Sequence, residues 1–504
     1  MKKNRWSFLV LFPIAAFIFL ALIELKIYPH QFWVDELYHV FAAIGILTTG
    51  HPLLPSGLLY ERSIITTLLI TGAFKVLGVS EFAARLPFLI IGILSITVTY
   101  FLVREIYTHH IALLTVFFLS ISPWQLYWST NVRMYILLQL LYLIFLYSGY
   151  KLLKELENRD LNKKRVSMLF VGLIAVLILT YYVHQFYILF IATGAAYLFY
   201  LAFKNLSSRN GIFKKRIPLL IFTISAILIF AALLYSKIPH TPTYTPIGMR
   251  MGMEFYTLLL VRYFPLYTLF AAVSVIAILW KEENRDRAPI VIFGFLVPFL
   301  LLSLLLDQKN SRYLFFTFPL LMAMAAHGVY EAWEKATRFR RKTLAKSLVL
   351  LAIALLLIQT CIGTYSMIYS DYQPLPYEDP HPHWRYASEY VEKNMKEDEI
   401  VLSTMPICTL YYLGKTDYWL RQNEYYGYID QQGVLRDRYT GAMILKDYET
   451  FINEIKGKHG WIIADRKLES YFTDFQVQEY IKNRMMLHPE GSDETISVYR
   501  FEKA

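Results

Sequence analysis

The stretch WSFLVLFPIAAFIFLALIELKI, residues 6–27, is followed after a short gap by WVDELY, residues 33–38. The first segment is long and apolar enough to cross a bilayer as a helix, which takes about 20 residues. The second segment places the adjacent carboxylates of Asp35 and Glu36 where that span would end. No small-residue cleavage site is evident between them, so we expect an uncleaved first transmembrane helix.

The acidic pair lies in an unusual setting. A lone carboxylate at the wet end of a membrane helix costs little and needs no special explanation. This pair is followed by a long semi-polar loop and many more apolar runs. Its neighbours include Trp33, Tyr38 and His39. We therefore interpret Asp35 and Glu36 as part of a functional site.

Composition indicates a polytopic membrane protein. The 504 residues are 56% hydrophobic and 16% aromatic, and only 18% are charged, which is too apolar for a soluble chain of this length. The net charge of +11 does not indicate nucleic acid as a partner, because Lys and Arg are concentrated in short loops. The two cysteines, Cys361 and Cys408, indicate neither a disulfide framework nor a thiolate metal cluster.

The apolar runs predict an all-α polytopic bundle with about eleven transmembrane helices. They cover approximately residues 7–27, 86–103, 110–128, 134–150, 166–183, 186–203, 217–235, 256–280, 288–306, 314–332 and 344–368. Loops rich in Lys and Arg alternate with loops that are not, and the basic ones are residues 151–165, 204–216, 281–287 and 335–346. By the positive-inside rule, the N terminus is cytoplasmic and the first loop, residues 28–84, faces the extracytoplasmic side.

After the last span the chain becomes more polar, and an odd number of spans places it outside the membrane. We expect residues 1–369 to form the transmembrane domain and residues 370–504 an extracytoplasmic α/β domain. Helical patterns at residues 384–395, 451–456 and 468–485 alternate there with strand patterns at residues 399–404, 460–465 and 496–501. The proline-rich residues 374–383 suggest a linker, and no glycine-rich phosphate loop indicates a nucleotide site.

The predicted external loops carry the residues from which a site can be built. In the first loop, residues 58–77 have the pattern of an amphipathic helix lying along the membrane surface, with Glu61 and Arg62 at its start. Other candidates are Arg133, Tyr135, His184, Arg312 and Tyr313. Carboxylates among arginines and tyrosines suit a reaction in which a base activates an acceptor hydroxyl while cations hold a phosphate leaving group. Arginine suits this task because its planar fork binds phosphate oxygens in pairs and keeps its charge.

Three passages, in this order, carry a resemblance to a known family: WVDE (residues 33–36), GVSEFAARLP (78–87) and the segment from SPW to NVRMY (122–135). They look like the membrane glycosyltransferases of the protein mannosyltransferase and lipid A aminoarabinose transferase superfamily, which have the C-type glycosyltransferase fold. YYVHQFY (181–187) and RYL (312–314) are similar to further recurring segments. The resemblance covers roughly the first 330 residues.

The resemblance implies a polyprenyl-phosphate-linked sugar as donor, transfer on the extracytoplasmic face and inversion at the anomeric carbon. The acceptor would be a lipid, a glycan or a protein. Asp35 would be the base with Glu36 its companion, and Arg62 would bind the donor phosphate, with Arg133 and Arg312 as further cations. No cofactor is required, although a divalent metal is compatible with the site, with Glu61 and His184 as candidate ligands. Tyr38, His39, Tyr135 and Tyr313 are the remaining site candidates.

Two departures from the family pattern affect these expectations. Relatives often carry an acidic residue in the second external loop, whereas this chain has Asn131 and Tyr135 around Arg133, so no second acid is assigned. The WWDYG motif of oligosaccharyltransferases is absent from the sequence. Its absence argues against en bloc transfer of a glycan to asparagine.

Two other classes of protein remain open. A lipid or sugar transporter, or a flippase, would be expected to carry charged or helix-breaking residues near the middle of the membrane, and few are found. A polytopic anchor for an external binding domain would not need the unusual residues of the external loops. Arg133 and Arg312 in particular lie on the outer side, against the positive-inside trend.

Overall fold

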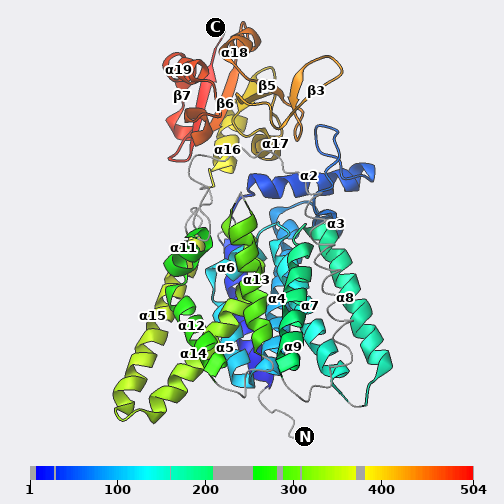
Figure 1. Ribbon diagram of the computed structural model, residues 1–504. Coiled ribbons are helices and arrows are strands. Elements are labelled where there is room, and N and C mark those ends of the chain that lie inside the picture. Colours follow the sequence, from blue (N-terminus) through cyan, green and yellow to red (C-terminus); the bar gives the residue numbers. More distant parts are fainter. Residues whose placement is uncertain are drawn as a thin grey trace.

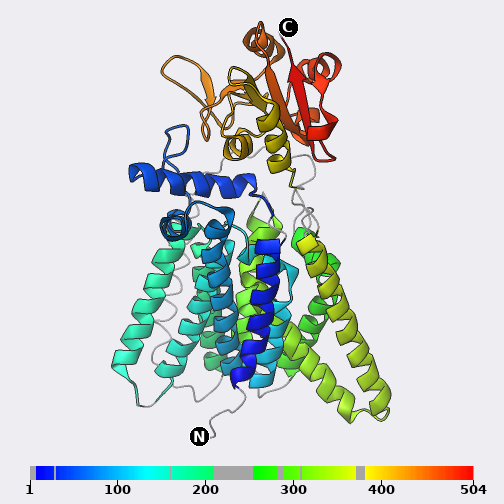
Figure 2. The same cartoon turned by 180° about the vertical axis from the view of Figure 1, so that it is seen from behind.

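The computed structural model describes residues 7–27, 30–158, 160–207, 254–280, 288–306, 309–369 and 381–502. The first apolar run folds into α1 (Leu11–Leu22) and ends in a π-helical turn, Ile23–Ile27. Helix α1 lies on one face of a helical bundle, and a smaller α/β domain is placed at one end of the bundle (Figures 1 and 2).

The first loop contains two helices, where the sequence predicted one. Helix α2 (Val34–Thr49) lies across the end of the bundle beneath the C-terminal domain (Figure 1). It begins where the Glu36 carboxylate accepts the backbone N–H of Trp33 (2.8 Å), and it ends at Gly50, whose φ of 80° is in the left-handed region. The predicted surface helix is α3 (Ile64–Leu77), so the prediction of its start at residue 58 was several residues early.

The remaining bundle helices follow in chain order. They are α4 (Glu81–Ile106), α5 (His109–Ser120), α6 (Pro123–Ser129), α7 (Tyr135–Leu156), α8 (Lys163–Val183), α9 (Tyr187–Ser207), α11 (Glu254–Tyr263), α12 (Pro265–Trp280), α13 (Pro289–Leu305), α14 (Phe318–Arg338) and α15 (Lys342–Tyr369). Among the described residues, five helices are long and apolar enough to cross a membrane, or up to seven if each of two bent pairs is one span. The span predicted at residues 217–235 lies outside the described residues.

Two predicted continuous spans are bent pairs of helices. The span predicted at residues 110–128 is α5 and α6, which meet at 66°, and the span at 256–280 is α11 and α12, which meet at 109°. The second helix of each pair begins with proline, Pro123 or Pro265. Proline disfavours the helical conformation of the residue before it, and hydropathy alone does not register such a break.

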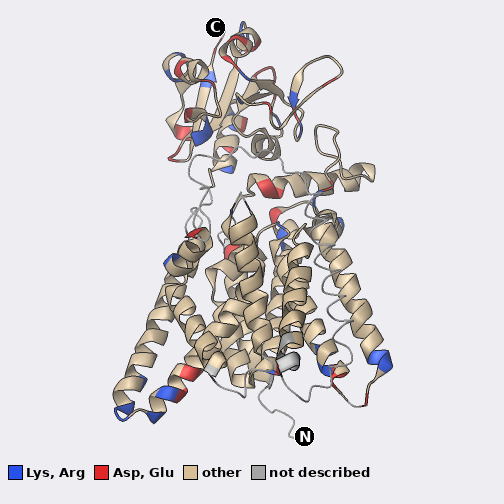
Figure 3. Cartoon of the chain, in the orientation of Figure 1, with Lys and Arg blue, Asp and Glu red and all other residues tan. Residues whose placement is uncertain are grey.

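Basic residues gather at the end of the bundle opposite the C-terminal domain (Figure 3). They lie at the end of α7, at the start of α8 and at the connection between α14 and α15. Glu105 at the end of α4 pairs there with Lys151 (2.6 Å) and Lys154 (3.4 Å).

The C-terminal domain is built on one eight-stranded sheet. The strands are β1 (Ile400–Ser403), β2 (Tyr418–Leu420), β3 (Gly427–Ile429), β4 (Leu435–Asp437), β5 (Met443–Leu445), β6 (Gly460–Asp465), β7 (Met486–Leu487) and β8 (Ile496–Phe501). Their spatial order is β3-β4-β5-β2-β1-β6-β8-β7, with β5, β2, β1 and β6 parallel. The helices are α16 (Trp384–Asn394), α17 (Pro406–Leu413), α18 (Tyr448–Ile455) and α19 (Phe475–Arg484). The predicted strands at residues 460–465 and 496–501 coincide with β6 and β8.

Contacts fix the C-terminal domain onto the first loop and α4. The Tyr412 hydroxyl donates to the Glu81 carboxylate and accepts from the backbone N–H of Phe32, each at 2.6 Å. Arg385 of α16 pairs with the same Glu81. At the other end of α2, the Ser56 hydroxyl donates to the carbonyl oxygen of Arg438 (2.6 Å). The domain therefore lies directly over the helix that carries Asp35.

Candidate active site

Asp35 is held between two arginines that come from distant parts of the chain. Arg133 Nη2 lies 3.1 Å and Arg312 Nη1 3.5 Å from Asp35 Oδ2. Arg133 also donates from Nη1 to the backbone carbonyl of Asp35 (2.8 Å), which fixes the first turn of α2. The Arg133 side chain is only 4% exposed, whereas the Asp35 side chain is 27% exposed. The carboxylate is thus ionised, anchored and still open to solvent or substrate.

Short irregular segments place both arginines. Arg133 lies in the connection between α6 and α7, and Arg312 lies in the 3-10 turn Ser311–Tyr313 that precedes α14. Both guanidinium groups lie 5.8 Å from the ring centre of Tyr135. One aromatic ring therefore contacts both cations. The Asp35 carboxylate, which pairs with both, offsets the repulsion between them.

The electrostatic balance keeps Asp35 charged. Burial raises the pKa of this carboxyl, but Arg133, Arg312 and Arg62 lower it by more, and the net result is a pKa of about 2. The proximity of three cations is therefore the dominant feature of the site.

Glu36, the neighbour of Asp35, has a different environment. Successive helix residues point about 100° apart, so Glu36 faces the protein interior, where it is 1% exposed. Its carboxylate accepts the backbone N–H groups of Trp33 and Val132, each at 2.8 Å, and pairs with Arg85 at 3.4 Å. It thereby positions the start of α2 against the segment that carries Arg133.

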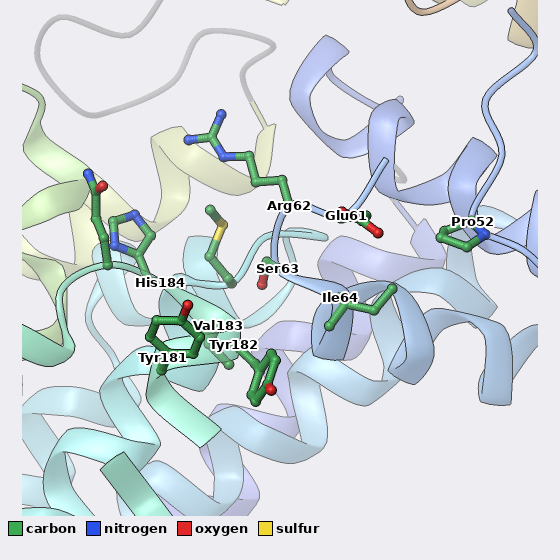
Figure 4. Close-up of a pocket in the computed structure, with 11 residues that line it drawn as sticks. Pro52, Glu61, Arg62, Ser63, Ile64, Tyr181, Tyr182, Val183 and His184 are labelled. Atoms are coloured by element: carbon green, nitrogen blue, oxygen red, sulfur yellow. The ribbon is translucent and has the colours of Figure 1, made fainter. Parts of the chain in front are cut away.

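A cavity of about 760 Å³ opens beside these residues. One wall is the segment before α3, which includes Glu61 and Arg62, and the opposite wall is the end of α8, which includes Tyr181 and Tyr182 (Figure 4). His184 also lines it. The cavity therefore extends from Arg62 and from Met134, the neighbour of Arg133, to exposed tyrosines at the end of a candidate membrane span.

Arg62 and Glu61 diverge within this cavity. In Figure 4, Arg62 extends its guanidinium toward the side where His184 lies, whereas Glu61 points toward Pro52. The next residue, Ser63, has a φ of 50°, in the left-handed region that non-glycine residues rarely adopt. Such a conformation is costly, and strained residues cluster at functional sites. This turn directs Arg62 into the cavity.

The two histidines of the site are neutral. Burial and, to a smaller extent, the nearby arginines Arg62, Arg133 and Arg312 together lower the pKa of His184 to about 3. Its Nδ1 accepts the backbone N–H of Phe186 (3.2 Å). Burial likewise holds the pKa of His39 well below its ordinary value. His39 faces α3, where its Nδ1 lies 3.1 Å from the Thr67 hydroxyl oxygen, and thus packs between helices.

Three tyrosines surround the charged groups. Tyr135 lies between the arginine pair and the cavity, 6.1 Å from His184 and 6.4 Å from Tyr313 by ring centres. Tyr38 stacks on Tyr439 of the C-terminal domain at 4.0 Å between ring centres. The structure thus separates the predicted tyrosines into two near the cavity and one in the domain contact.

No group of three or more His, Cys, Asp or Glu side chains that would suit a metal ion occurs among the described residues. The two predicted ligands, Glu61 and His184, do line the same cavity.

Sequence reasoning assigned no role to several residues that build this site. Arg85 lay within a quoted motif, yet only the structure shows it buried, with its guanidinium donating to the backbone carbonyls of His30 and Gln31. The signal that could have identified Arg85 is the presence of an arginine at the start of an apolar run. Tyr439 gave no signal because Tyr38, on which it stacks, lies in a distant part of the chain, and Tyr426 joins the site only through its contact with Tyr439.

Comparisons with known proteins agree with this architecture. The sequence profile of the dolichyl-phosphate-mannose-protein mannosyltransferase family matches residues 61–235. The fold is similar to ArnT from Cupriavidus metallidurans, with a TM-score of 0.61, 13% identity and 97% coverage of both chains for the apo state. For ArnT bound to undecaprenyl phosphate, the TM-score is 0.59 and the identity 11%, over 99% of this chain and 98% of the other.

An archaeal structure is also similar. AglB from Archaeoglobus fulgidus, in complex with an inhibitory peptide and a dolichol-phosphate, gives a TM-score of 0.60 at 12% identity over 96% of this chain and 74% of AglB. A search of curated protein sequences finds no match. The profile match and the shared fold together support the assignment of this chain to the superfamily of C-type membrane glycosyltransferases.

Proposed function

We propose that the protein transfers a single sugar from a polyprenyl-phosphate donor to an acceptor hydroxyl, with inversion, on the extracytoplasmic face of the membrane. The observation that carries this proposal is the Asp35 carboxylate, held by Arg133 and Arg312 beside a cavity that Arg62 lines. A base and several cations within one site match the two needs of the reaction.

The donor phosphate binds in the cavity. Arg62 and Arg312 can each offer paired N–H groups to phosphate oxygens, and Tyr181 and Tyr182 lie where the polyprenyl chain enters from the bilayer. ArnT bound to undecaprenyl phosphate and AglB with a dolichol-phosphate support a lipid phosphate as the ligand of this fold. The acceptor is a lipid, a glycan or a protein.

The chemical step follows from this placement. Asp35 takes the proton of the acceptor hydroxyl while the acceptor oxygen forms a bond to the anomeric carbon. On the opposite face, the bond from the anomeric carbon to the phosphate oxygen breaks, and polyprenyl phosphate leaves with the electron pair. Attack opposite to the leaving group inverts the anomeric configuration. Arg62 and Arg312 stabilise the charge that develops on the phosphate.

The same arginines link departure of the phosphate to proton uptake by Asp35. In the resting protein they hold the pKa of Asp35 at about 2, which makes the carboxylate a weak base. As the phosphate gains negative charge, it interacts more strongly with these cations. Their stabilisation of the Asp35 carboxylate then weakens, and the pKa of Asp35 rises. Asp35 therefore becomes a better base as the leaving group departs.

The extracytoplasmic orientation rests on charge distribution. Lys and Arg gather at the bundle end opposite the C-terminal domain (Figure 3). Helix α2, which carries Asp35, lies at the other end, beneath that domain (Figure 1). By the positive-inside rule, the end rich in Lys and Arg is cytoplasmic. The scheme routes no step through a metal ion.

The test uses purified full-length protein in lipid nanodiscs with radiolabelled polyprenyl-phosphate sugars and a membrane extract as the source of acceptor. Wild-type protein is expected to release polyprenyl phosphate, and Asp35→Asn to lose about 100- to 10,000-fold of that rate. Asp430→Asn, which alters a carboxylate paired with Arg436 in the C-terminal domain, is the matched control and is expected to keep full activity. Movement of intact donor across the bilayer without cleavage would instead indicate a transporter.

A further inference from the structure

Arg421 is a buried cation of the C-terminal domain that forms no direct ion pair with a carboxylate of the described residues. It directly follows β2, is 8% exposed, and has no acidic group within salt-bridge distance among the described residues. Three aromatic rings surround its guanidinium carbon, those of Trp419 (4.6 Å), Tyr426 (5.1 Å) and Phe472 (5.1 Å). Burying an unpaired charge is costly, so its retention calls for a compensating ligand.

The hydrogen bonds of Arg421 leave its outer nitrogens available. Nε donates to the Asn423 side-chain oxygen at 3.0 Å, and the described residues accept no hydrogen bond from Nη1 or Nη2. Aromatic contact on the faces of a guanidinium leaves its edge free, and the edge is the part that binds oxyanions in pairs. Burial lowers the pKa of Arg421, and the nearby Asp437 carboxylate, which accepts hydrogen bonds from the backbone N–H and the hydroxyl of Thr440, acts in the opposite direction.

The sheet topology directs Arg421 toward Asp35. In α/β sheets, ligands bind at the carboxyl ends of the parallel strands. Here the carboxyl ends of β2 and β6 carry Arg421 and Lys467, and the Lys467 Nζ lies 5.6 Å from the ring centre of Trp33, next to α2. The ligand-binding edge of the C-terminal sheet is thus turned to the helix that carries the base.

Consecutive ring contacts connect Arg421 to the catalytic helix. Tyr38, three residues after Asp35 and so on the same side of α2, stacks on Tyr439 at 4.0 Å. Tyr439 contacts Tyr426 at 5.9 Å, and Tyr426 packs on Arg421. The donor cavity, in contrast, is lined only by bundle and first-loop residues. Arg421 therefore lies on the C-terminal-domain side of α2, apart from the residues that line the cavity.

We propose that Arg421 binds an oxyanion, a phosphate or a carboxylate, carried by the acceptor, so that the C-terminal domain selects the substrate to be glycosylated. This inference rests on the proposed transferase function. It assigns Arg421 a specificity role, with no part in the chemical step.

The test measures hydrogen–deuterium exchange of residues 419–427 in full-length protein in phosphatidylcholine nanodiscs, with and without inorganic phosphate. Phosphate is expected to slow exchange of this segment in wild-type protein. Arg421→Gln is expected to need about tenfold more phosphate for the same effect, because a charge-assisted hydrogen bond is lost. Arg421→Lys, which keeps the charge, is expected to retain part of the response, and Arg436→Gln, whose partner is Asp430, is the matched control.

A second set of nanodiscs, containing phosphatidylglycerol and no added phosphate, distinguishes the source of the anion. Slowed exchange there indicates a lipid headgroup, and slowed exchange only with dissolved phosphate indicates a water-soluble acceptor. No response to phosphate in wild-type protein, or an equal response in Arg421→Gln, would overturn the inference. Arg62→Gln separates the two proposals: it removes a donor-site cation and is expected to leave the response at residues 419–427 intact. Failure of wild-type protein to consume donor would refute the proposed function without altering this binding result.

Discussion

Replacing Arg312 by glutamine should make the activity sensitive to acid. Arg312 is one of three arginines that hold the pKa of Asp35 at about 2 against the opposing effect of burial. At an effective dielectric constant of about 20, unit charges about 4 Å apart interact by roughly 4 kcal/mol. Solvent screening of the partly exposed Asp35 reduces this to about 1.4–2.7 kcal/mol, or about one to two pKa units. In Arg312→Gln the pKa of Asp35 should therefore rise to about 3–4.

The assay is kcat/KM for donor cleavage between pH 4 and pH 8. The base must be deprotonated, so activity falls as the pH drops toward its pKa. Wild-type protein should show no acid limb attributable to Asp35 in this range, whereas Arg312→Gln should lose up to about half of its remaining kcat/KM near pH 4. Its loss of phosphate binding lowers activity at every pH and does not change the shape of the profile.

Arg436→Gln, which removes a paired arginine far from Asp35 in the chain, is the control and should keep the wild-type profile. A flat profile in Arg312→Gln would refute the claim that Arg312 tunes Asp35. An acid limb in wild-type protein near pH 6 would show that another group is the base.

Three further predictions concern the donor, the scaffold and the metal. Arg62→Gln should raise the KM for donor by about tenfold or more by loss of a charge-assisted phosphate contact. Lys75→Gln, in the last turn of α3, which follows the segment of Arg62, should not. Glu36→Gln should lower the free energy of unfolding by about 3–5 kcal/mol, because Arg85 stays buried without its counter-ion. Thermal and denaturant unfolding in detergent measure this change. An unchanged stability would contradict the positioning role of Glu36. Treatment with EDTA followed by desalting should leave the transfer rate unchanged, and loss of activity that Mg²⁺ or Mn²⁺ restores would show that a metal takes part.

Strong periodic signals in the sequence correspond to the elements they predicted. The apolar run at residues 6–27 contains α1, and the strand patterns at 460–465 and 496–501 match β6 and β8. Helix α2 was assigned to a loop because it is too short and too polar to span a membrane. The bends before Pro123 and Pro265 were missed because hydropathy averages over them.

The site could be predicted only in part. The predicted topology put Asp35, Arg133 and Arg312 on one face of the membrane, but their contact depends on the two irregular segments that carry the arginines, whose course hydropathy does not determine. In the sequence, Asp35 and Glu36 are simply adjacent carboxylates. Because successive residues of a helix point in different directions, Glu36 is buried in the interior whereas Asp35 is partly exposed. The approach of Tyr439 to Tyr38 depends on how a distant domain docks.

The most direct test of the account is a cryo-EM structure of the protein with polyprenyl phosphate bound, from which the position of the phosphate is measured. The account predicts the phosphate in the cavity, within about 3 Å of the guanidinium groups of Arg62 and Arg312 and facing Asp35. A phosphate bound elsewhere, with Asp35 still enclosed by its arginines and remote from the lipid, would contradict the assignment of Asp35 as the base.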